Sequence, residues 1–473
     1  MKYVSTRGGA PALSFDDVLL TGLAPDGGLY LPARWPRLTR SEIAALAGLS
    51  YAETATRVMA PFVGAAIDAE TLARTIDEAY AGFDHPAVAP LRQIGSNDWL
   101  LELFHGPTLA FKDYALQLVG RLFDHVLAAR RARVTIVGAT SGDTGAAAIE
   151  ALRDRDNVVV CILHPKDRIS EIQRRQMTTV TAANVHNVAI EGTFDDCQAL
   201  LKAMFADADF RAATHLSAVN SINWARVMAQ TVYYVTAAVA LGAPHRPVSF
   251  SVPTGNFGDI FAGHVARRMG LPIESLVIAT NRNDILARFV ETGRYQTGAV
   301  VPTLSPSMDI QVASNFERYL YELLGRDGAR VAALMETLAR TGGFAVDRAA
   351  LNETRAAFAA HGVDDAETEA AIASLYRRTG MIVDPHTATG IAAATAYRGD
   401  RAAPMITLAT AHPAKFPDAV TRAIGAAPPV PPPLAGIESR PERCAVLPND
   451  LARVKDFVRS VAVAAPEREP ETS

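Results

Sequence analysis

The first candidate for chemistry in this sequence is a lysine in the first turn of a predicted helix. In FHGPTLAFKDYALQLVGRLFDHVL (104–127), apolar residues recur at three- and four-residue steps, which predicts a helix beginning near Phe111. Lys112 then lies at the positive end of the helix dipole, which disfavours an ammonium and favours the neutral, nucleophilic form of the side chain. A neutral lysine is what Schiff-base chemistry requires. The alternative is a solvated lysine at a helix start.

Two glycine-containing turns between a predicted strand and a predicted helix are candidates for binding anions. In ATSGDTGAAAIE (139–150), backbone N–H groups and the hydroxyls of Thr140, Ser141 and Thr144 suit a carboxylate; the alternative is a capped turn. In SVPTGNFGDIFAGHVARRMG (251–270), the loop GNFGD lets the backbone wrap round a phosphate; the alternative is a plain tight turn. The second loop is neither a Walker loop nor GxGxxG, so it does not indicate nucleotide binding.

Two further segments carry polar side chains at a spacing that suits a ligand. In NSINWARVMAQTVYY (220–234), Asn223, Arg226 and Gln230 share one helix face, where a guanidinium would bind a phosphate monoester through two parallel donors. A solvated helix face is the alternative. In ITLATAHPAKFPDAV (406–420), His412 and Lys415 follow the end of a predicted strand, where they either contact a ligand or cap the next helix.

The elements that carry these motifs alternate between short apolar runs and helical patterns from about residue 99 onward. The predicted strands include RVTIVGA (133–139), VVVCILHP (158–165), PVSFSVPTG (247–255), SLVIATN (275–281) and PMITLATA (404–411). This alternation predicts parallel strands with crossover helices, and so an α/β fold of two open, mostly parallel sheet domains facing one cleft. Between the last two of these strands, a mostly helical block is expected over residues 312–379.

The chain length of 473 residues exceeds what one hydrophobic core usually supports, so several domains are expected. The Pro-rich stretch GAAPPVPPPLAG (425–436) predicts an extended linker. We expect an N-terminal region (1–95), an α/β domain carrying the lysine (96–240), a larger α/β domain with the phosphate loop (241–425), and the linker with a C-terminal tail (426–473).

Composition and charge exclude several classes of partner. The formal net charge is −4, which gives no reason to expect nucleic acid or an anionic membrane as a partner. Cys161, Cys197 and Cys444 are widely separated, so neither a disulfide nor a metal site is expected, and a reducing cytoplasm fits. The N-terminus lacks a signal-peptide pattern, and the apolar stretches are too short to span a membrane.

The order of the motifs, more than any one of them, points to a family. FHGPTLAFKD, SGDTG, NSIN, GNFGD, SPSMDI (305–310), DPHTA (384–388) and ATAHPAKF occur in the order found in threonine synthases, which the chain resembles from STRGG and PDGGLYLP onward. The resemblance is to the longer form of that family, which carries an added N-terminal region. It implies the fold-type II architecture of pyridoxal-phosphate enzymes.

The resemblance also implies roles for individual residues. Lys112 would hold pyridoxal 5′-phosphate as a Schiff base, and Thr410 would face the pyridine nitrogen. The cofactor phosphate would be wrapped by Gly255, Asn256, Phe257, Gly258 and Asp259. The substrate carboxylate or the ring face of the cofactor would be bordered by Ser141, Gly142, Asp143 and Thr144. Many relatives place Asn where Asp143 stands, so this chain has a carboxylate where they have an amide beside the phenolate oxygen.

The implied reaction converts O-phospho-L-homoserine and water into L-threonine and phosphate, the last step of threonine biosynthesis, by a carbon–oxygen lyase acting on phosphates. The substrate carries two anions, and Asn223 and Arg226 are the candidates for holding its phosphate, with Lys415 and Arg318 next. The alternatives are another pyridoxal-phosphate lyase, such as a serine or threonine dehydratase or a phospholyase, or a non-catalytic ligand-binding relative. We expect a cytoplasmic monomer or homodimer.

Overall fold

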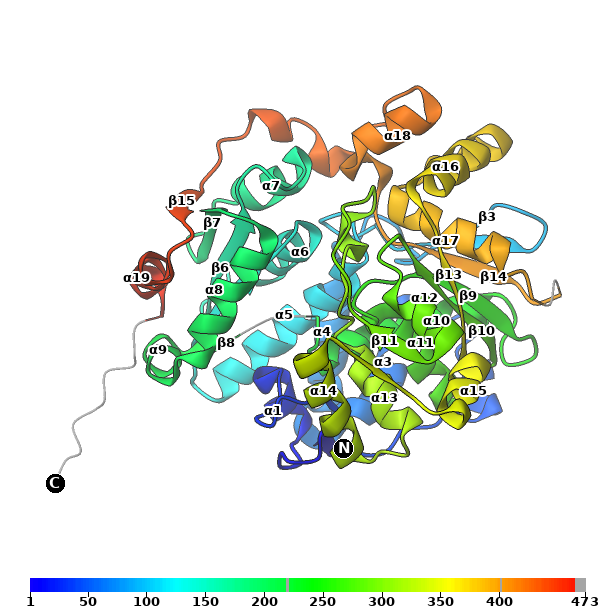
Figure 1. Ribbon diagram of the computed structural model, residues 1–473, viewed down its shortest axis with the longest axis horizontal. Coiled ribbons are helices and arrows are strands. Elements are labelled where there is room, and N and C mark those ends of the chain that lie inside the picture. The colour runs from blue at the N-terminus through cyan, green and yellow to red at the C-terminus, as the bar shows by residue number, and fades with distance from the viewer. Residues whose placement is uncertain (218–220, 400–401, 464–473) are drawn as a thin grey trace. The chain divides into compact units, whose positions relative to one another are not determined.

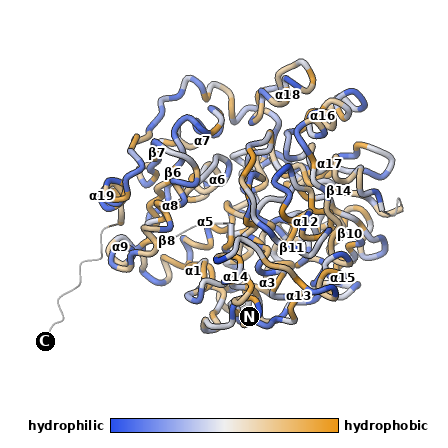
Figure 2. The backbone as a smooth tube through the Cα atoms, in the orientation of Figure 1, coloured by the Kyte–Doolittle hydropathy of each residue, from blue (hydrophilic) through white to orange (hydrophobic). Residues whose placement is uncertain are grey.

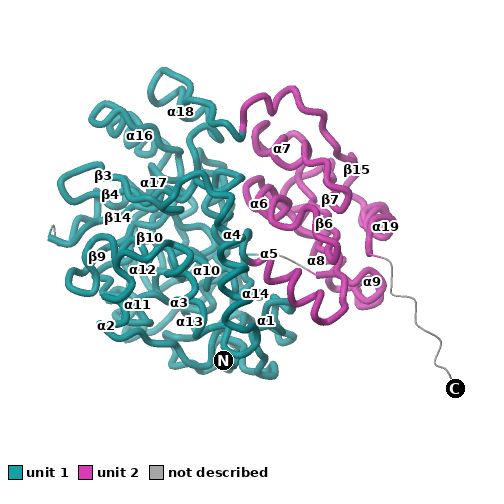
Figure 3. The backbone as a smooth tube through the Cα atoms, turned by 180° about the vertical axis from the view of Figure 1, so that it is seen from behind, with its two compact units in different colours: residues 1–118, 221–433 teal, residues 119–220, 434–473 magenta. Residues whose placement is uncertain are grey.

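The computed structural model describes residues 1–217, 221–399 and 402–463 of the chain (Figure 1). These residues form two compact units, each assembled from two stretches of chain (Figure 3). Unit 1 comprises residues 1–118 and 221–433, and unit 2 comprises residues 119–220 and 434–473. The cuts between the units differ from the boundaries expected near 95, 240 and 425, since a unit that combines distant stretches has no signature along the sequence. The division into four consecutive segments stays a prediction.

A six-stranded sheet forms the centre of unit 1, in the order β13-β10-β9-β14-β4-β3. Its strands are β3 (Leu91–Gln93), β4 (Asp98–Glu102), β9 (Val248–Pro253), β10 (Ile273–Thr280), β13 (Phe358–Gly362) and β14 (Met405–Ala409). All neighbours are parallel except β3 and β4. Every residue of β9 and β14 is buried, as expected of strands covered on both faces of a parallel sheet. The strands predicted at 247–255, 275–281 and 404–411 are confirmed.

Helices and two small ribbons complete unit 1. The helices are α1 (Phe15–Thr21), α2 (Arg40–Ala44), α3 (Tyr51–Val63), α4 (Ala69–Tyr80), α5 (Lys112–Ala129, which continues into unit 2), α10 (Trp224–Ala240), α11 (Gly258–Met269), α12 (Ile285–Thr292), α13 (Phe316–Leu323), α14 (Gly328–Thr341), α15 (Arg348–Ala357), α16 (Asp365–Thr379), α17 (Pro385–Ala396) and α18 (Pro417–Ile424). The antiparallel ribbons pair β1 (Tyr3–Ser5) with β2 (Tyr30–Pro32), and β11 (Arg294–Gln296) with β12 (Gly343–Ala345). Helix α17 packs on β9, β10 and β14, and α10 packs between α3 and α11.

A five-stranded parallel sheet forms unit 2, in the order β15-β7-β6-β5-β8. Its strands are β5 (Val134–Ala139), β6 (Val158–Pro165), β7 (Val185–Glu191), β8 (Leu216–Ser217) and β15 (Ala445–Pro448). Its helices, besides the end of α5, are α6 (Asp143–Leu152), α7 (Glu171–Thr178), α8 (Phe194–Ala206), α9 (Ala208–Thr214) and α19 (Leu451–Val461). The mostly parallel α/β architecture predicted from the sequence is confirmed in both units.

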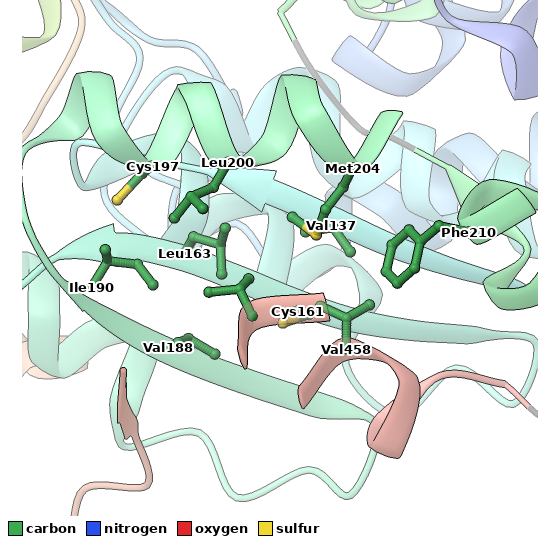
Figure 4. Packing of buried hydrophobic residues seen from close by; sticks show 11 residues of the cluster. Val137, Cys161, Leu163, Val188, Ile190, Cys197, Leu200, Met204, Phe210 and Val458 are labelled. Atoms are coloured by element: carbon green, nitrogen blue, oxygen red, sulfur yellow. The ribbon is translucent and has the colours of Figure 1, made fainter. Parts of the chain in front are cut away.

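The core of unit 2 lies between one face of this sheet and helices α8 and α19 (Figure 4). Cys161, Leu163 and Val188 on the strands pack with Met204 of α8 and Val458 of α19. Cys161 is buried in this core, and all three cysteines are free. Figure 2 shows the hydropathy of the residues along the backbone, with hydrophobic stretches in orange alternating with hydrophilic ones in blue.

Within the described ranges, no helix combines the length and apolar character that a membrane span needs. In the same part of the chain, no group of His, Cys, Asp and Glu side chains is arranged to hold a metal ion.

Candidate active site

Lys112 is the first residue of α5, one position after the predicted helix start. Its side chain is buried, with 8% of its surface exposed, and Nζ lies 4.9 Å from the centre of the Phe111 ring. The N–H of Phe111 donates a hydrogen bond of 2.9 Å to the carbonyl of Thr410, which follows β14. The structure therefore brings together the lysine and the threonine that the sequence separates by almost 300 residues.

The loop that precedes Lys112 is closed by its own side chains. Asp113 accepts hydrogen bonds from the N–H and the hydroxyl of Thr108, at 2.8 and 2.7 Å. Lys415 is fully buried, and its Nζ donates to the carbonyl of Thr108 at 2.8 Å. His412 accepts a hydrogen bond from the N–H of Ala414 through Nδ1, so it caps the turn that follows, as the alternative interpretation of this residue had it.

The loop GNFGD leads from β9 into α11 by a backbone path that leaves the helix start uncapped. Phe257 occupies the N-cap position with a φ of +63°, and its side chain makes no capping hydrogen bond. A Cβ atom at Gly255 would lie 2.9 Å from the carbonyl oxygen of Ser307, so only glycine fits against this neighbouring turn. Free N–H groups at a helix start behind a glycine cradle are suited to a phosphate group.

Asp259 is the last residue of this loop and was expected to bind the cofactor phosphate. Its carboxylate instead contacts two tyrosine hydroxyls. Oδ1 accepts hydrogen bonds from the hydroxyls of Tyr233 and Tyr234, at 2.5 and 2.9 Å. Burial raises the pKa of Asp259 to about 6, while the two hydroxyls and the charge of Lys112 lower it. Because a carboxylate repels a phosphate, Asp259 is suited to an anion only through its N–H group.

Two motifs to which the sequence assigned no role support this loop from behind. Ser307, in SPSMDI, donates its N–H to Nε2 of His386 at 3.2 Å, and Nδ1 of His386 lies 2.7 Å from Asp384. Asp384 is fully buried and also accepts the N–H of Thr387 at 3.0 Å. Since Ser307 packs against Gly255, the carboxylate–imidazole pair in DPHTA fixes the turn that backs the phosphate loop. The motif order was the only sequence signal for this connection.

The polar face of α10 is buried, so the alternative of a solvated helix face is wrong for this segment. Asn223 caps the helix: Oδ1 accepts from the N–H of Ala225 at 3.0 Å, and Nδ2 donates to the carbonyl of Leu19 at 2.8 Å. Arg226 is 4% exposed, and its Nε and Nη1 have no hydrogen-bond partner within the described residues. Burial lowers the pKa of Arg226 to about 10, which leaves the guanidinium charged at neutral pH.

Arg318, another candidate for binding the substrate phosphate, uses its side-chain nitrogens in hydrogen bonds to the protein itself. Its Nε and Nη2 donate to the carbonyl of Tyr30 at 3.0 and 2.8 Å. It also contacts the carbonyl of Ile222 at 2.5 Å and the side chain of Asn315. These bonds connect the N-terminal region to α13 and to the segment before α10. The role of Arg318 is therefore structural.

The SGDTG turn, in unit 2, leads into α6 through a glycine at the N-cap position. Gly142 precedes α6 with a φ of +136° and no side-chain capping bond. The hydroxyl of Thr140, expected to join an anion cradle, instead accepts the N–H groups of Gly142 and Gly145 at 3.0 and 2.9 Å. Gln173 lies over Gly142 and donates from Nε2 to Asp143 at 2.8 Å. Gln173 was missed because no local pattern links it to this turn.

Comparisons with known proteins identify the family. Three family models match in succession: "Threonine synthase N terminus" over residues 2–80, "Pyridoxal-phosphate dependent enzyme" over 85–361, and "Threonine synthase, C-terminal" over 387–458. The chain is 58% identical to threonine synthase of Pseudomonas aeruginosa over 459 residues, covering 97% of this chain and 98% of that one. The chain belongs to the threonine synthase family.

Solved structures agree with this assignment to the threonine synthases. The chain superposes on pyridoxal-phosphate-bound threonine synthase from Brucella melitensis with a TM-score of 0.96 and 55% identity, covering 98% of this chain and 100% of that one. For yeast threonine synthase the TM-score is 0.92 and the identity 38%, covering 97% and 98%. The resemblance, the fold-type II architecture and the dependence on pyridoxal phosphate expected from the sequence are confirmed. The buried lysine and the glycine cradle of unit 1 fit that cofactor.

Proposed function

We propose that the enzyme converts O-phospho-L-homoserine and water into L-threonine and inorganic phosphate, with Lys112 as the residue that carries pyridoxal 5′-phosphate. The observation that carries the assignment of the lysine is its position: it is buried at the start of α5 and held to Thr410 through Phe111. The phosphate loop lies in the same compact unit, at the start of α11, where the N-cap residue makes no side-chain capping bond.

The cofactor, when bound, supplies an electron sink for charge that develops at the substrate Cα. The backbone N–H groups of Gly255, Asn256, Phe257, Gly258 and Asp259 are proposed to bind its phosphate. The hydroxyl of Thr410 is proposed to face the ring nitrogen, and a neutral hydroxyl leaves that nitrogen without an anionic partner.

Lys112 is proposed to take the proton from the substrate Cα and to move it during the later steps. Its burial and its place at a positive helix end both favour the neutral amine that can accept a proton. Ser141, Gly142, Asp143 and Thr144 are proposed to orient the substrate carboxylate, with the N–H groups of Asp143 and Thr144 at the start of α6 as donors.

Arg226 is proposed to hold the substrate phosphate. It is a buried cation with two nitrogen atoms that lack hydrogen-bond partners within the described residues, so it has donors to offer. The two rival cations differ in this respect, since Lys415 donates to Thr108 and Arg318 donates to main-chain carbonyls. Asn223 is proposed to assist, and its cap on Ala225 fixes the first turn of α10 on which Arg226 lies.

The setting of the enzyme is proposed from its composition. A net charge of −4 and three free cysteines suit a cytoplasmic protein that acts on a small molecule without nucleic acid. We propose a monomer or a homodimer.

One assay tests this function. Purified enzyme is supplied with O-phosphohomoserine, and threonine and inorganic phosphate are quantified in the same samples. We expect equal amounts of both products. Release of phosphate with ketobutyrate in place of threonine would assign the chain to a phospholyase, and the absence of phosphate release would refute the proposed substrate.

A further inference from the structure

His105 lies between two carboxylates, near the start of the loop that ends at Lys112. Its Nδ1 lies 2.6 Å from Oδ1 of Asp84, and its Nε2 lies 3.0 Å from Oε2 of Glu102. Glu102 is the last residue of β4, and Asp84 lies in the segment that follows α4. We refer to these three side chains as the His105 clamp. The chemistry proposed above gives them no role.

The two contacts fix the charge of His105. An ionised carboxylate only accepts hydrogen bonds, so each ring nitrogen that contacts one must carry a proton. A neutral imidazole has a single N–H group and would direct a lone pair at the other carboxylate. Burial lowers the pKa of His105, but the hydrogen bonds to Glu102 and Asp84 and the charges of both carboxylates outweigh burial and raise the pKa overall.

Two further histidines face the clamp. The ring of His85 lies 5.1 Å from that of His105, and Nδ1 of His85 accepts the N–H of Ala87 at 3.1 Å. His412 meets the ring of Phe104, the neighbour of His105, edge to face at 5.4 Å. Burial, followed by the charge of His105, lowers the pKa of His412 to about 4, so His412 is neutral at neutral pH. The charges that balance His105 are therefore the two carboxylates.

The backbone connects the clamp to Lys112. The carbonyl of His105 accepts the N–H of Asp84 at 2.9 Å, which holds the loop at its start. A Cβ atom on Gly106 would lie 2.5 Å from Cβ of Asp113, the residue that follows Lys112, so the loop packs directly on the first turn of α5. A displacement of His105 therefore reaches that turn through one intervening residue.

We propose that His105 is a positioning residue for Lys112. As a cation held between two carboxylates, it fixes the loop from which α5 begins, and so aligns the lysine amine with the substrate Cα. The inference rests on the proposed role of Lys112. No proton passes between His105 and the substrate. When His105 loses its proton to solvent, one carboxylate faces a lone pair, the clamp opens on that side and the alignment is poorer.

The direction of the pH dependence follows from the raised pKa of His105. The clamp is fully formed below about pH 6.5, the ordinary value for histidine, and is lost as the pH rises through the higher value in the folded enzyme. We therefore expect part of kcat to be lost with rising pH in step with the deprotonation of His105.

Both quantities are measured on the holoenzyme. Imidazole nitrogens of enzyme labelled with ¹⁵N-histidine are followed by NMR over a pH series, and the His105 signals are assigned by their absence from His105→Gln. At the same pH values, kcat and KM are determined with O-phosphohomoserine. In the wild-type enzyme, both ring nitrogens of His105 should carry protons at neutral pH.

Two carboxylate variants move the titration without removing it. Asp84→Asn and Glu102→Gln keep the shape of each side chain and remove one charge, so the NMR midpoint and the fall in kcat should both move to lower pH by roughly half a unit or more. The shift should be larger for Glu102→Gln, because the side chain of Glu102 is 13% exposed and that of Asp84 is 57% exposed. Asp77→Asn removes an exposed carboxylate of α4 and is the matched control, with both midpoints unchanged.

His105→Gln removes the titrating group itself. We expect kcat about three- to tenfold below the wild-type value where wild-type His105 is protonated, with KM changed by less than about twofold and the visible cofactor absorption retained. The fall in kcat that accompanies the His105 titration should be absent. If this variant does not fold, the His105 signals are those that shift in both carboxylate variants and not in Asp77→Asn, and those variants decide.

A neutral His105 below about pH 6.5 would overturn the inference. So would a kcat profile that stays fixed while the NMR midpoint of His105 moves, or a uniform loss of kcat in His105→Gln with the pH-dependent fall intact, which would leave the residue a structural role alone. Failure of the proposed function is seen separately in the wild-type enzyme, by borohydride reduction and mass spectrometry that place the cofactor on a lysine other than Lys112.

Discussion

At the scale of single residues, the site depends on which polar atoms the fold leaves available. Arg318 and Lys415 are cations, but both donate hydrogen bonds to main-chain carbonyls. Arg226 is also buried, but two of its nitrogens have no hydrogen-bond partner within the described residues. The phosphate-binding role is therefore assigned to the cation whose N–H donors lack partners in the protein, because all three candidates carry a positive charge.

Lys112→Ala should abolish both the visible absorption of the enzyme and all turnover. The substitution removes the attachment point of the cofactor and the group that moves the substrate proton. Absorption spectra and product analysis of purified variants provide the measurement. Lys415→Ala is a control for the loss of a buried lysine, because it should destabilise the loop at Thr108 while the cofactor band remains. Normal activity in Lys112→Ala would show that the wrong lysine has been chosen.

Arg226→Leu should weaken turnover while leaving the cofactor spectrum intact. Loss of one charge-assisted contact to the substrate phosphate costs roughly 1.5–3 kcal/mol, or about ten- to a hundredfold in kcat/KM. Arg226→Lys keeps the charge without the planar pair of donors and should recover part of the loss. Steady-state kinetics with O-phosphohomoserine measure both. Wild-type kcat/KM in the leucine variant would mean that the phosphate is held elsewhere.

At the scale of elements, the starts of α5, α6 and α11 matter more than the helices themselves. Sequence patterns predicted each start because a short apolar run, a turn and a helical period follow one another. The structure adds what holds each turn in place: Asp113 at α5, Gln173 at α6 and Ser307 at α11. Asp113 lies within the sequence motif whose turn it holds. Gln173 and Ser307 are distant in sequence from the turns that they contact.

His386→Phe should reduce the affinity for pyridoxal phosphate. The ring shape is kept, but the N–H of Ser307 and the carboxylate of Asp384 each lose a partner. An unsatisfied buried polar group costs about 1–3 kcal/mol, so the dissociation constant should rise roughly 5- to 150-fold if the turn behind Gly255 loosens. Dialysis followed by titration with the cofactor measures this. His386→Gln can still accept from Ser307 and should bind more tightly than the phenylalanine variant, whereas equal, wild-type affinity in both would refute the connection.

The strands that the sequence failed to reveal show the limit of local patterns. Strand β13 has the sequence FAAHG and follows a helix without a break, so its alanines continue a helical composition. Strand β15 comprises four residues after a Pro-rich stretch, and only its pairing with β7 makes it a strand. Likewise, the buried contacts of Arg318 and Asp259 join residues that are distant in sequence, and such pairings are fixed by the tertiary fold. The positions of the motifs along the chain could be read from the sequence, whereas the contacts that join one motif to another could not.

At the scale of the whole molecule, each compact unit is completed by a late part of the chain. In unit 2, strand β15 forms the edge of the sheet beside β7, and α19 covers its core. Residues 445–461 of the expected C-terminal tail are therefore part of the folded structure of unit 2.

Val458→Ala should destabilise unit 2 by about 2 kcal/mol, because it leaves a cavity between α19 and the sheet. Hydrogen exchange, followed in peptides from β6, β7 and α8, should become faster in this variant. Val446→Ala on β15 is the matched control, since that side chain is 53% exposed and should have little effect. Equal exchange in the two variants would show that α19 does not contribute to the stability of this core.

Strand β14 has a consequence for how the enzyme is made. It lies between β9 and β4, and β3 is the other neighbour of β4 in this sheet. During synthesis on the ribosome, the hairpin of β3 and β4 emerges early but has no sheet to join until residues 405–409 have left the exit tunnel. The carbonyl of Thr410, which receives the N–H of Phe111, appears only then. The contact that holds Phe111, and with it the start of α5 at Lys112, therefore cannot form in a nascent chain before Thr410 has left the exit tunnel.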